Sequence, residues 1–244
     1  KMLGVDVNNL AWFVARVRTT PLSRGEMEGL YLWAARAVDR SYSQTDGPIV
    51  PAVKNLPGAT KAFIACALDD VQSLQSRSQQ DFARCVLLRL GQWAVDCRRS
   101  APPARNLRTK LLSLTTEMLD GVEEFVAQCR QAGMSRRGIV QSRRLACRSA
   151  VGLESDRRLD AAIARPRVVF TSPPYPGVHV LYHRWQYRGR RETSAPYWIA
   201  SQRDGRFESF YTGGSRTPTG ETRYFEMIEA AFSCCLCCPV EGIK

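Results

Sequence analysis

Residues 168–176 have the sequence Val-Val-Phe-Thr-Ser-Pro-Pro-Tyr-Pro, in which an apolar run of strand length leads directly into a proline pair. A second apolar run occupies residues 145–147, and residues 155–163 between the two runs are compatible with a helix. Strand, helix and strand in this order predict a β-α-β unit with a parallel sheet. Ligands of such sheets bind at the carboxyl ends of the strands, so we expect the chemistry at residues 171–175.

The N-terminal residues predict another strand of the same kind. Residues 2–6, Met-Leu-Gly-Val-Asp, form a short apolar run that ends in an acid. Asn8 or Asn9 is suited to cap a helix whose apolar residues follow at helical spacing, and Pro21 ends that helix. The chain therefore opens with a strand and a helix.

The middle of the chain has a different pattern. Four apolar stripes at helical spacing lie within residues 22–132, separated by proline and glycine residues. This pattern predicts a helical subdomain of about four helices with an ordinary apolar core. Residues 192–202 and 220–236 also have helical patterns.

The proline pair has a chemical consequence. Proline stiffens the backbone and lacks an N–H donor, so the carbonyls and the Ser172 hydroxyl remain as rigid acceptors beside the face of Tyr175. This arrangement suits a flat ring that carries an amino group, because the tyrosine can stack while the acceptors take the amino hydrogens. The alternative is that the proline pair is only a rigid surface corner.

The Ser-Pro-Pro-Tyr sequence after an apolar strand resembles the catalytic motif of DNA methyltransferases that modify exocyclic amino groups. The resemblance implies transfer from S-adenosylmethionine to adenine N6 or cytosine N4, and an α/β fold with a Rossmann-like parallel sheet. Residues 1–23 resemble the second-strand segment of these enzymes, although the usual Asp-x-Asn-Pro is here Asp-Val-Asn-Asn at residues 6–9. Residues 148–150, Arg-Ser-Ala, match less specifically the segment beside the cofactor adenine.

The resemblance implies the following site residues. The catalytic residues are Ser172, Pro173, Pro174 and Tyr175. The cofactor-binding residues are Asp6, Asn8, Ser149 and Thr171, with Asp6 holding the ribose. We expect no metal ligand, because His179 and His183 lack a third partner and the Cys234–Cys238 run lacks a second pair or a histidine.

These residues imply direct displacement. The base amino group attacks the methyl carbon, so no covalent enzyme intermediate is needed. Enzymes that methylate cytosine carbon need a cysteine nucleophile beside their proline, and none is near Ser172. The motif therefore excludes the carbon-methylating class.

The charge of the chain indicates a polyanionic partner. Lysine and arginine total 35 against 23 acids, a net charge of +12, and all but five of the cations are arginine. An arginine-biased genome would give the same count. The expected DNA contacts are Arg143, Arg144, Arg184, Arg188, Arg190 and Arg191. Residues 178–192 interleave cations with aromatics, which is typical of a nucleic-acid surface or of a solvated loop that braces the active site.

Together, these expectations predict a fold class and a division of the chain into three regions. The fold class is α/β, an incomplete Rossmann-like methyltransferase sheet with a large helical insertion. Residues 1–23 are the remnant of the cofactor-binding half, residues 24–140 the helical insertion and candidate target-recognition region, and residues 141–244 the catalytic half. No Gly-rich cofactor loop is present, so we expect a truncated fragment that is inactive or weakly binding alone.

Composition and context complete the expectations. The chain is 44% hydrophobic and 24% charged, which excludes wholesale disorder. No apolar run is long enough to span a membrane and no secretory signal is visible, so we expect a cytoplasmic protein. The resemblance to DNA methyltransferases also implies a restriction or defence-system partner. Two alternatives stay open: a non-catalytic basic helical module that binds nucleic acid, and a methyltransferase acting on RNA or on a protein amide.

Overall fold

The computed structural model describes residues 1–39, 52–156, 168–171, 184–189, 191–204 and 217–236. The chain divides into two compact units. The sheet unit comprises residues 1–12, 141–180 and 205–244, and the helical unit comprises residues 13–140 and 181–204. Each is described by itself below.

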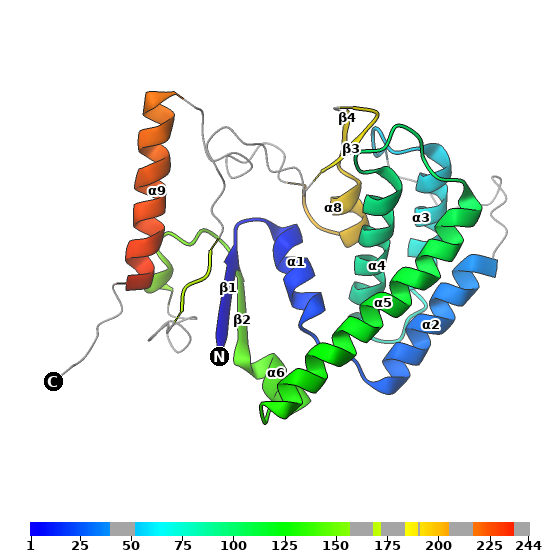
Figure 1. Cartoon of the computed structure of the whole chain (residues 1–244), viewed down its shortest axis with the longest axis horizontal. Helices are drawn as coiled ribbons and strands as arrows, with labels where there is room; N and C mark the ends of the chain where they lie inside the picture. Colours follow the sequence, from blue (N-terminus) through cyan, green and yellow to red (C-terminus); the bar gives the residue numbers. More distant parts are fainter. Residues whose placement is uncertain (40–51, 157–167, 172–183, 190, 205–216, 237–244) are drawn as a thin grey trace. The chain divides into compact units, whose positions relative to one another are not determined.

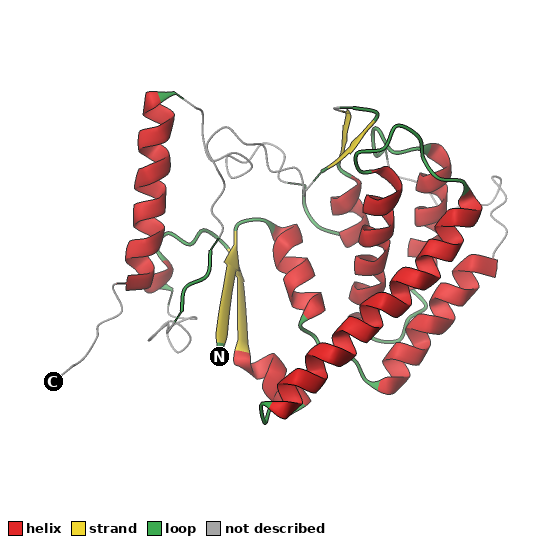
Figure 2. Cartoon of the chain, in the orientation of Figure 1, coloured by secondary structure: helices red, strands yellow, loops and turns green. Residues whose placement is uncertain are grey.

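The sheet unit contains two paired strands (Figure 2). Strand β1 (Met2–Asp6) lies parallel to β2 (Arg143–Cys147), with Met2 opposite Arg143 and Asp6 opposite Cys147. The predicted strands at residues 2–6 and 145–147 are therefore confirmed. The sequence predicted a parallel sheet from a β-α-β unit that joins residues 145–147 to 168–170, and it did not predict that β1 and β2 pair with each other. This mixed helix and strand content agrees with the α/β class, while the finer Rossmann-like assignment remains a prediction.

The sheet packs on the segment that follows β2. A 3-10 helix (Leu153–Ser155) places Leu153 at 5% exposure against Leu3, Val5, Ala146 and Ala150. Helix α9 (Pro218–Leu236) contacts this 3-10 helix and confirms the helix expected at residues 220–236. In the region expected to be helical at 155–163, Asp156 is not helical and residues 157–163 lie outside the described residues.

The predicted strand at residues 168–170 is wrong. These residues have no strand structure, and Val168 and Phe170 are 82% and 96% exposed. A buried parallel strand needs a hydrogen-bonded neighbour and cover on both faces. Three apolar residues are too few to specify a strand by pattern alone, which explains the error.

The helical unit confirms the predicted helices within residues 22–132. These are α2 (Arg24–Asp39), α3 (Gly58–Val71), α4 (Arg77–Val95) and α5 (Ala104–Gln131) (Figure 1). Helix α1 (Asn9–Arg18) precedes them and α6 (Arg136–Ser142) follows. Trp33, Phe63, Phe82 and Leu111, one from each of the four helices, are at most 2% exposed and lie in the shared core.

A short hairpin and a helix complete this unit. Strands β3 (Trp185–Tyr187) and β4 (Arg191–Thr193) pair in antiparallel fashion, and α8 (Ala195–Ala200) follows. The helix predicted at residues 192–202 is therefore shorter, because its first residues pair with β3 instead. Trp185 and α8 pack on α4.

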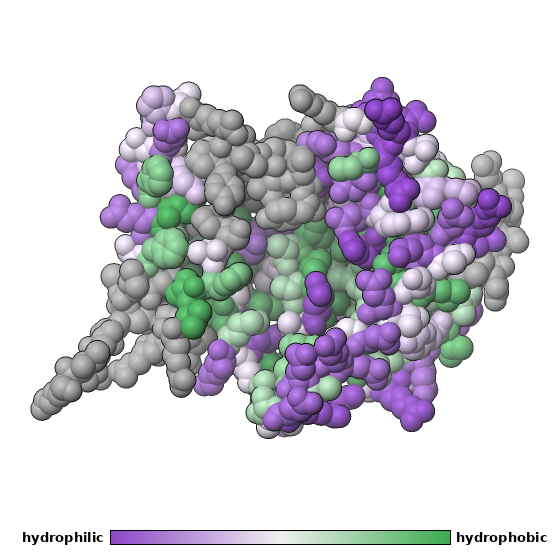
Figure 3. All heavy atoms as spheres, viewed as in Figure 1, coloured by the Kyte–Doolittle hydropathy of each residue, from purple (hydrophilic) through white to green (hydrophobic). Residues whose placement is uncertain are grey.

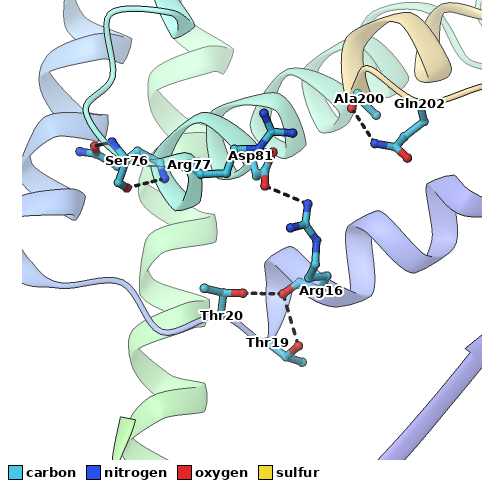
Figure 4. Close-up of polar contacts among 9 residues, drawn as sticks. Arg16, Thr19, Thr20, Ser76, Arg77, Asp81, Ala200 and Gln202 are labelled. Atoms are coloured by element: carbon cyan, nitrogen blue, oxygen red, sulfur yellow. Dashed lines mark hydrogen bonds and ion pairs between the residues drawn. The ribbon is translucent and has the colours of Figure 1, made fainter. Parts of the chain in front are cut away.

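Polar contacts fix the ends of the helices in this unit (Figure 4). Asp81 on α4 is paired with Arg16 on α1 at 2.8 Å and with Arg77 at 3.1 Å. Ser76 caps α4 by accepting from the Gln79 N–H at 3.1 Å, while the Gln79 side chain accepts from the Ser76 N–H. The capping box defines where α4 begins.

In the part of the chain that the structure describes, no helix is long and apolar enough to cross a membrane.

Gly91 provides a test of the helical core. A methyl group at this position of α4 would collide with Cη2 and Cζ3 of Trp185, which is 3% exposed. Gly91→Ala gains about 1 kcal/mol of helix propensity but overpacks a rigid indole, at a cost of about 1–3 kcal/mol. We expect a net loss of stability in urea denaturation.

Gly121→Ala on α5 is the matched control. Nothing lies within 4 Å of a methyl group at that position, so the same substitution should stabilise by about 0.5–1 kcal/mol. Equal effects of the two substitutions would contradict the packing described here.

Candidate functional site

The carboxyl end of β1 presents an acid. Asp6 is exposed at the last position of the strand, and its Oδ1 accepts from the Asn8 N–H at 2.7 Å. Its backbone carbonyl accepts from the Arg148 N–H at 2.9 Å, which continues the β1–β2 pairing beyond the strands. Among the described residues, no cation is paired with this carboxylate.

The surroundings of Asp6 shift its titration. Desolvation at the strand end raises the pKa of Asp6 above its usual value, and the hydrogen bond from Asn8 offsets part of this effect. Opposite Asp6 lies Cys147, whose pKa is raised by burial and then by the Asp6 charge. The Cys147 thiol donates to the Val7 carbonyl at 3.8 Å. It therefore lacks the lowered pKa of an activated nucleophile.

Asn8 has a different role from the one the resemblance implied. Asn8 is 2% exposed, and its side-chain Oδ1 accepts from the N–H groups of Leu10 at 2.8 Å and Ala11 at 3.3 Å. These are the bonds of a helix N-cap, so the predicted cap is confirmed. Because this oxygen caps α1, Asn8 fixes the path of the chain after Asp6 and does not present the oxygen to a ligand.

Ser149 lies in the turn that follows β2. It is exposed, and its hydroxyl oxygen accepts from the Val151 N–H at 3.1 Å. Because Asp6 and Cys147 are opposite each other in a parallel pair, Ser149 begins the loop at the same edge of the sheet as Asp6. The structure thus brings two of the four predicted cofactor residues, Asp6 and Ser149, to one edge.

Arg148 organises this loop, a role that the sequence analysis did not assign. Its Nη1 is paired with Asp156 at 2.8 Å, and its Nη2 donates to the Gly152 carbonyl at 3.1 Å. Its Nε donates to the Ser149 carbonyl at 3.2 Å. Asp156 is 8% exposed. Arginine can bind both an acid and several carbonyls because its planar group has five donors, but the sequence does not indicate which acid it meets.

The remaining predicted site residues are only partly described. Thr171 is exposed. Residues 172–175, which comprise Ser172, Pro173, Pro174 and Tyr175, lie outside the described residues, as does Arg190.

The predicted DNA contacts separate into distinct locations. Arg143 and Arg144 lie at the amino end of β2, opposite Met2 and Leu3, and so at the other end of the strand from Ser149. Arg188 and Arg191 are exposed on the β3–β4 hairpin of the helical unit. Within the sheet unit, Arg143 and Arg144 therefore lie at the opposite end of β2 from the predicted cofactor residues, and Arg188 and Arg191 belong to the other unit.

Arg184 is a correction. It is 5% exposed, is ion-paired with Asp204, and lies over the Tyr197 ring at 5.9 Å. A buried and paired guanidinium is a structural element of the helical unit, so the predicted DNA contact through Arg184 is wrong. The sequence pattern could not distinguish it from its exposed neighbours.

No group of three or more metal-ligating side chains gathers among the described residues. The side chains of the Cys234–Cys238 run are outside them. Within the described ranges, Cys66, Cys85, Cys97, Cys129 and Cys147 are free thiols.

No protein-family model matches this chain, and comparison with curated proteins and with solved structures gave no match either.

The titration of Asp6 gives a pH prediction. An acid whose folded-state pKa is raised stabilises the fold below its unfolded pKa of about 3.9, and this contribution is lost as the pH rises through the folded pKa. Asp6→Asn should therefore leave the free energy of unfolding at pH 7 equal or higher, with no gain at pH 3. The free energy of unfolding of the variant is compared with that of the native chain at each pH. A larger loss of stability at pH 7 than at pH 3 would contradict the raised pKa of Asp6.

The Arg148–Asp156 pair predicts the stability of the loop. Arg148→Gln leaves a buried carboxylate without its cation and should cost about 1–3 kcal/mol in urea denaturation. Arg144→Gln, at an exposed position of the preceding strand β2, should cost less than about 0.5 kcal/mol. The double variant Arg148→Gln/Asp156→Asn should lose less than the sum of its single variants. Strict additivity would show that the two side chains do not interact.

Proposed function

We propose that this protein is a DNA methyltransferase that transfers a methyl group from S-adenosylmethionine to the exocyclic amino group of cytosine or adenine. The observation that carries the proposal is the exposed carboxylate of Asp6 at the carboxyl end of a strand in a parallel pair. This is where α/β proteins bind ligands. The support for the base-binding half is the Thr-Ser-Pro-Pro-Tyr sequence at residues 171–175.

The described residues fit the ribose of the cofactor. The Asp6 carboxylate has one oxygen on the Asn8 N–H and no paired cation among the described residues, so it can accept from vicinal hydroxyl groups. The loop beginning at Ser149 is held by Arg148 at the same edge of the sheet, where it would lie beside the adenine. Asn8 would act indirectly, by fixing the turn between Asp6 and α1.

The residues of the motif would orient the base. The cofactor supplies an electrophilic methyl group bound to a sulfonium. The amino nitrogen of the base would attack that carbon as the carbon–sulfur bond breaks to leave a neutral thioether, and the nitrogen would then release one proton to solvent. Ser172 and the Pro173 carbonyl would accept from the amino group and favour the positive charge that develops on nitrogen. Tyr175 would stack on the flipped base.

The raised pKa of Cys147 agrees with a reaction that uses no thiolate. Covalent catalysis needs a thiolate, and burial keeps the pKa of this thiol above its ordinary value. Direct displacement uses no such nucleophile.

A second candidate is a basic helical module that binds nucleic acid without chemistry. The observation that favours it is the exposure of Arg188 and Arg191 on the hairpin of the helical unit. A measurement of S-adenosylmethionine binding separates the methyltransferase from the non-catalytic module, because the module needs no cofactor.

The test uses the protein with methyl-labelled S-adenosylmethionine and separate pools of DNA, RNA and protein. We expect label in DNA, on an amino nitrogen. Asp6→Asn should weaken cofactor binding about 10–100-fold by calorimetry, because a charged acceptor is replaced by an amide. Tyr175→Ala should retain cofactor binding and lose about 1–3 kcal/mol of stacking on the target base. This loss should be measured as weaker binding of a duplex in which the target base is mismatched or lies next to an abasic site.

Two results would overturn the proposal. Label found only in protein or RNA would reassign the substrate. Absence of cofactor binding by the full-length protein would favour the non-catalytic module.

A further inference from the structure

An arginine surface lies at one end of the helical unit. It consists of Arg98 and Arg99 from the α4–α5 connection and Arg188 and Arg191 from the β3–β4 hairpin. Arg99, Arg188 and Arg191 are exposed, and Arg98 is half-buried. Figure 3 shows hydrophilic residues gathered over the end that carries these segments.

Backbone hydrogen bonds join the two segments of the arginine surface. The Cys97 N–H donates to the Gln186 carbonyl at 2.8 Å, and the Arg188 N–H donates to the Arg98 carbonyl at 2.9 Å. The Arg188 Nε adds a bond to the Arg99 carbonyl at 3.3 Å. Arginines about 90 residues apart in the chain are therefore held together by the fold.

Aromatic rings support two of these guanidinium groups. Arg98 lies over the Trp93 ring at 4.9 Å and donates to the Trp93 carbonyl at 2.7 Å. Arg188 lies over the Tyr187 ring at 5.3 Å. Stacking on a ring restricts a long side chain without neutralising its charge, so less entropy is lost when the group meets an anion.

The local charge is strongly positive. Residues 97–116 contain Arg98, Arg99, Arg105, Arg108 and Lys110 and no acid. The acids of the two segments are Asp96 and Glu192. Asp96 Oδ1 accepts from the Gln186 N–H at 3.0 Å, so this carboxylate already serves the fold. The arginine surface thus has four arginines against two acids in these segments, and three of its arginines are exposed.

We propose that the arginine surface binds the phosphate backbone of duplex DNA. Arginine is suited to phosphate because its planar fork can donate two parallel hydrogen bonds. The cations are mounted on a two-stranded ribbon, an element narrow enough to enter a major groove, and on the adjoining connection, which would follow the flanking backbone. The choice of DNA over other polyanions rests on the proposed function.

The test is the salt dependence of binding to a labelled 20-base-pair duplex, followed by fluorescence anisotropy on the full-length protein. The triple variant Arg99→Gln/Arg188→Gln/Arg191→Gln should weaken binding at least ~10-fold at about 0.1 M salt. The slope of log Kd against log salt should fall by about 2–3, since each lost phosphate contact contributes about 0.9.

A charge-matched control removes three other exposed arginines of the same unit. The triple variant Arg24→Gln/Arg36→Gln/Arg130→Gln has the same net charge, and Arg130 lies about 40 Å along α5 from the end nearest Arg99. It should change Kd less than about threefold. Circular dichroism and thermal melting confirm that both variants are folded.

Three results would overturn the inference. The two triple variants could weaken binding equally, which would mean that only net charge matters. The native protein could fail to bind duplex DNA at any salt concentration. Single-stranded RNA of equal length could bind more tightly and alone depend on Arg99, Arg188 and Arg191, which would assign the surface to RNA.

Cofactor titration of the same variants separates this inference from the proposed function. Selective loss of DNA binding in a protein that binds no S-adenosylmethionine would support the arginine surface and overturn the methyltransferase. If the variants bind the cofactor and their affinity for DNA is unchanged, the proposed methyltransferase would be supported and the arginine surface would be overturned.

Discussion

The parallel pairing of β1 with β2 determines which side chains can share the candidate site. It joins residues 2–6 to residues 143–147 in a fixed register, and the Arg148 N–H extends it by one bond to the Asp6 carbonyl. Because side chains alternate along strands, a shift of one residue would turn Leu3 and Val5 away from Leu153. The same shift would separate Asp6 from the start of the Ser149 loop. Burial of Leu153 thus fixes the position of the acid.

The ionised Asp6 carboxylate at this edge is unfavourable for folding but is available to bind a ligand. Desolvation raises the pKa of Asp6, so its ionised form is disfavoured by the folded chain at neutral pH. An exposed carboxylate held in this way is typical of positions that serve binding more than stability. In the helical unit, by contrast, Asp81 lies between Arg16 and Arg77 and serves the packing of helices.

Much of the fold follows from local patterns in the sequence. The helices within residues 22–132 have long apolar stripes bounded by proline and glycine, and Asn8 has the side chain of an N-cap, so these elements could be predicted. The strand at residues 2–6 could be predicted because an apolar run ends in an acid. The three-residue run at 168–170 could not be assigned from so short a pattern, and there the prediction failed.

The candidate site was less predictable because it depends on pairings between distant residues. Asp6 could be singled out as a strand-end acid, but the clamp of Arg148 on Asp156 is a tertiary contact. Arg184 and Arg188 lie in the same basic stretch, yet one is buried against Asp204 and the other is exposed. The contribution of Arg98 and Arg99 depends on a bridge between α4–α5 and β3 that no local pattern indicates.

We propose that the edge formed by Asp6 and the Ser149 loop binds S-adenosylmethionine. Ultraviolet cross-linking of the radiolabelled cofactor, followed by tryptic peptide mapping, tests it most directly. The account predicts label in the peptides of residues 2–16 and 149–157, lost when unlabelled cofactor competes. Competed label confined to peptides of the helical unit beyond residue 16 would contradict it.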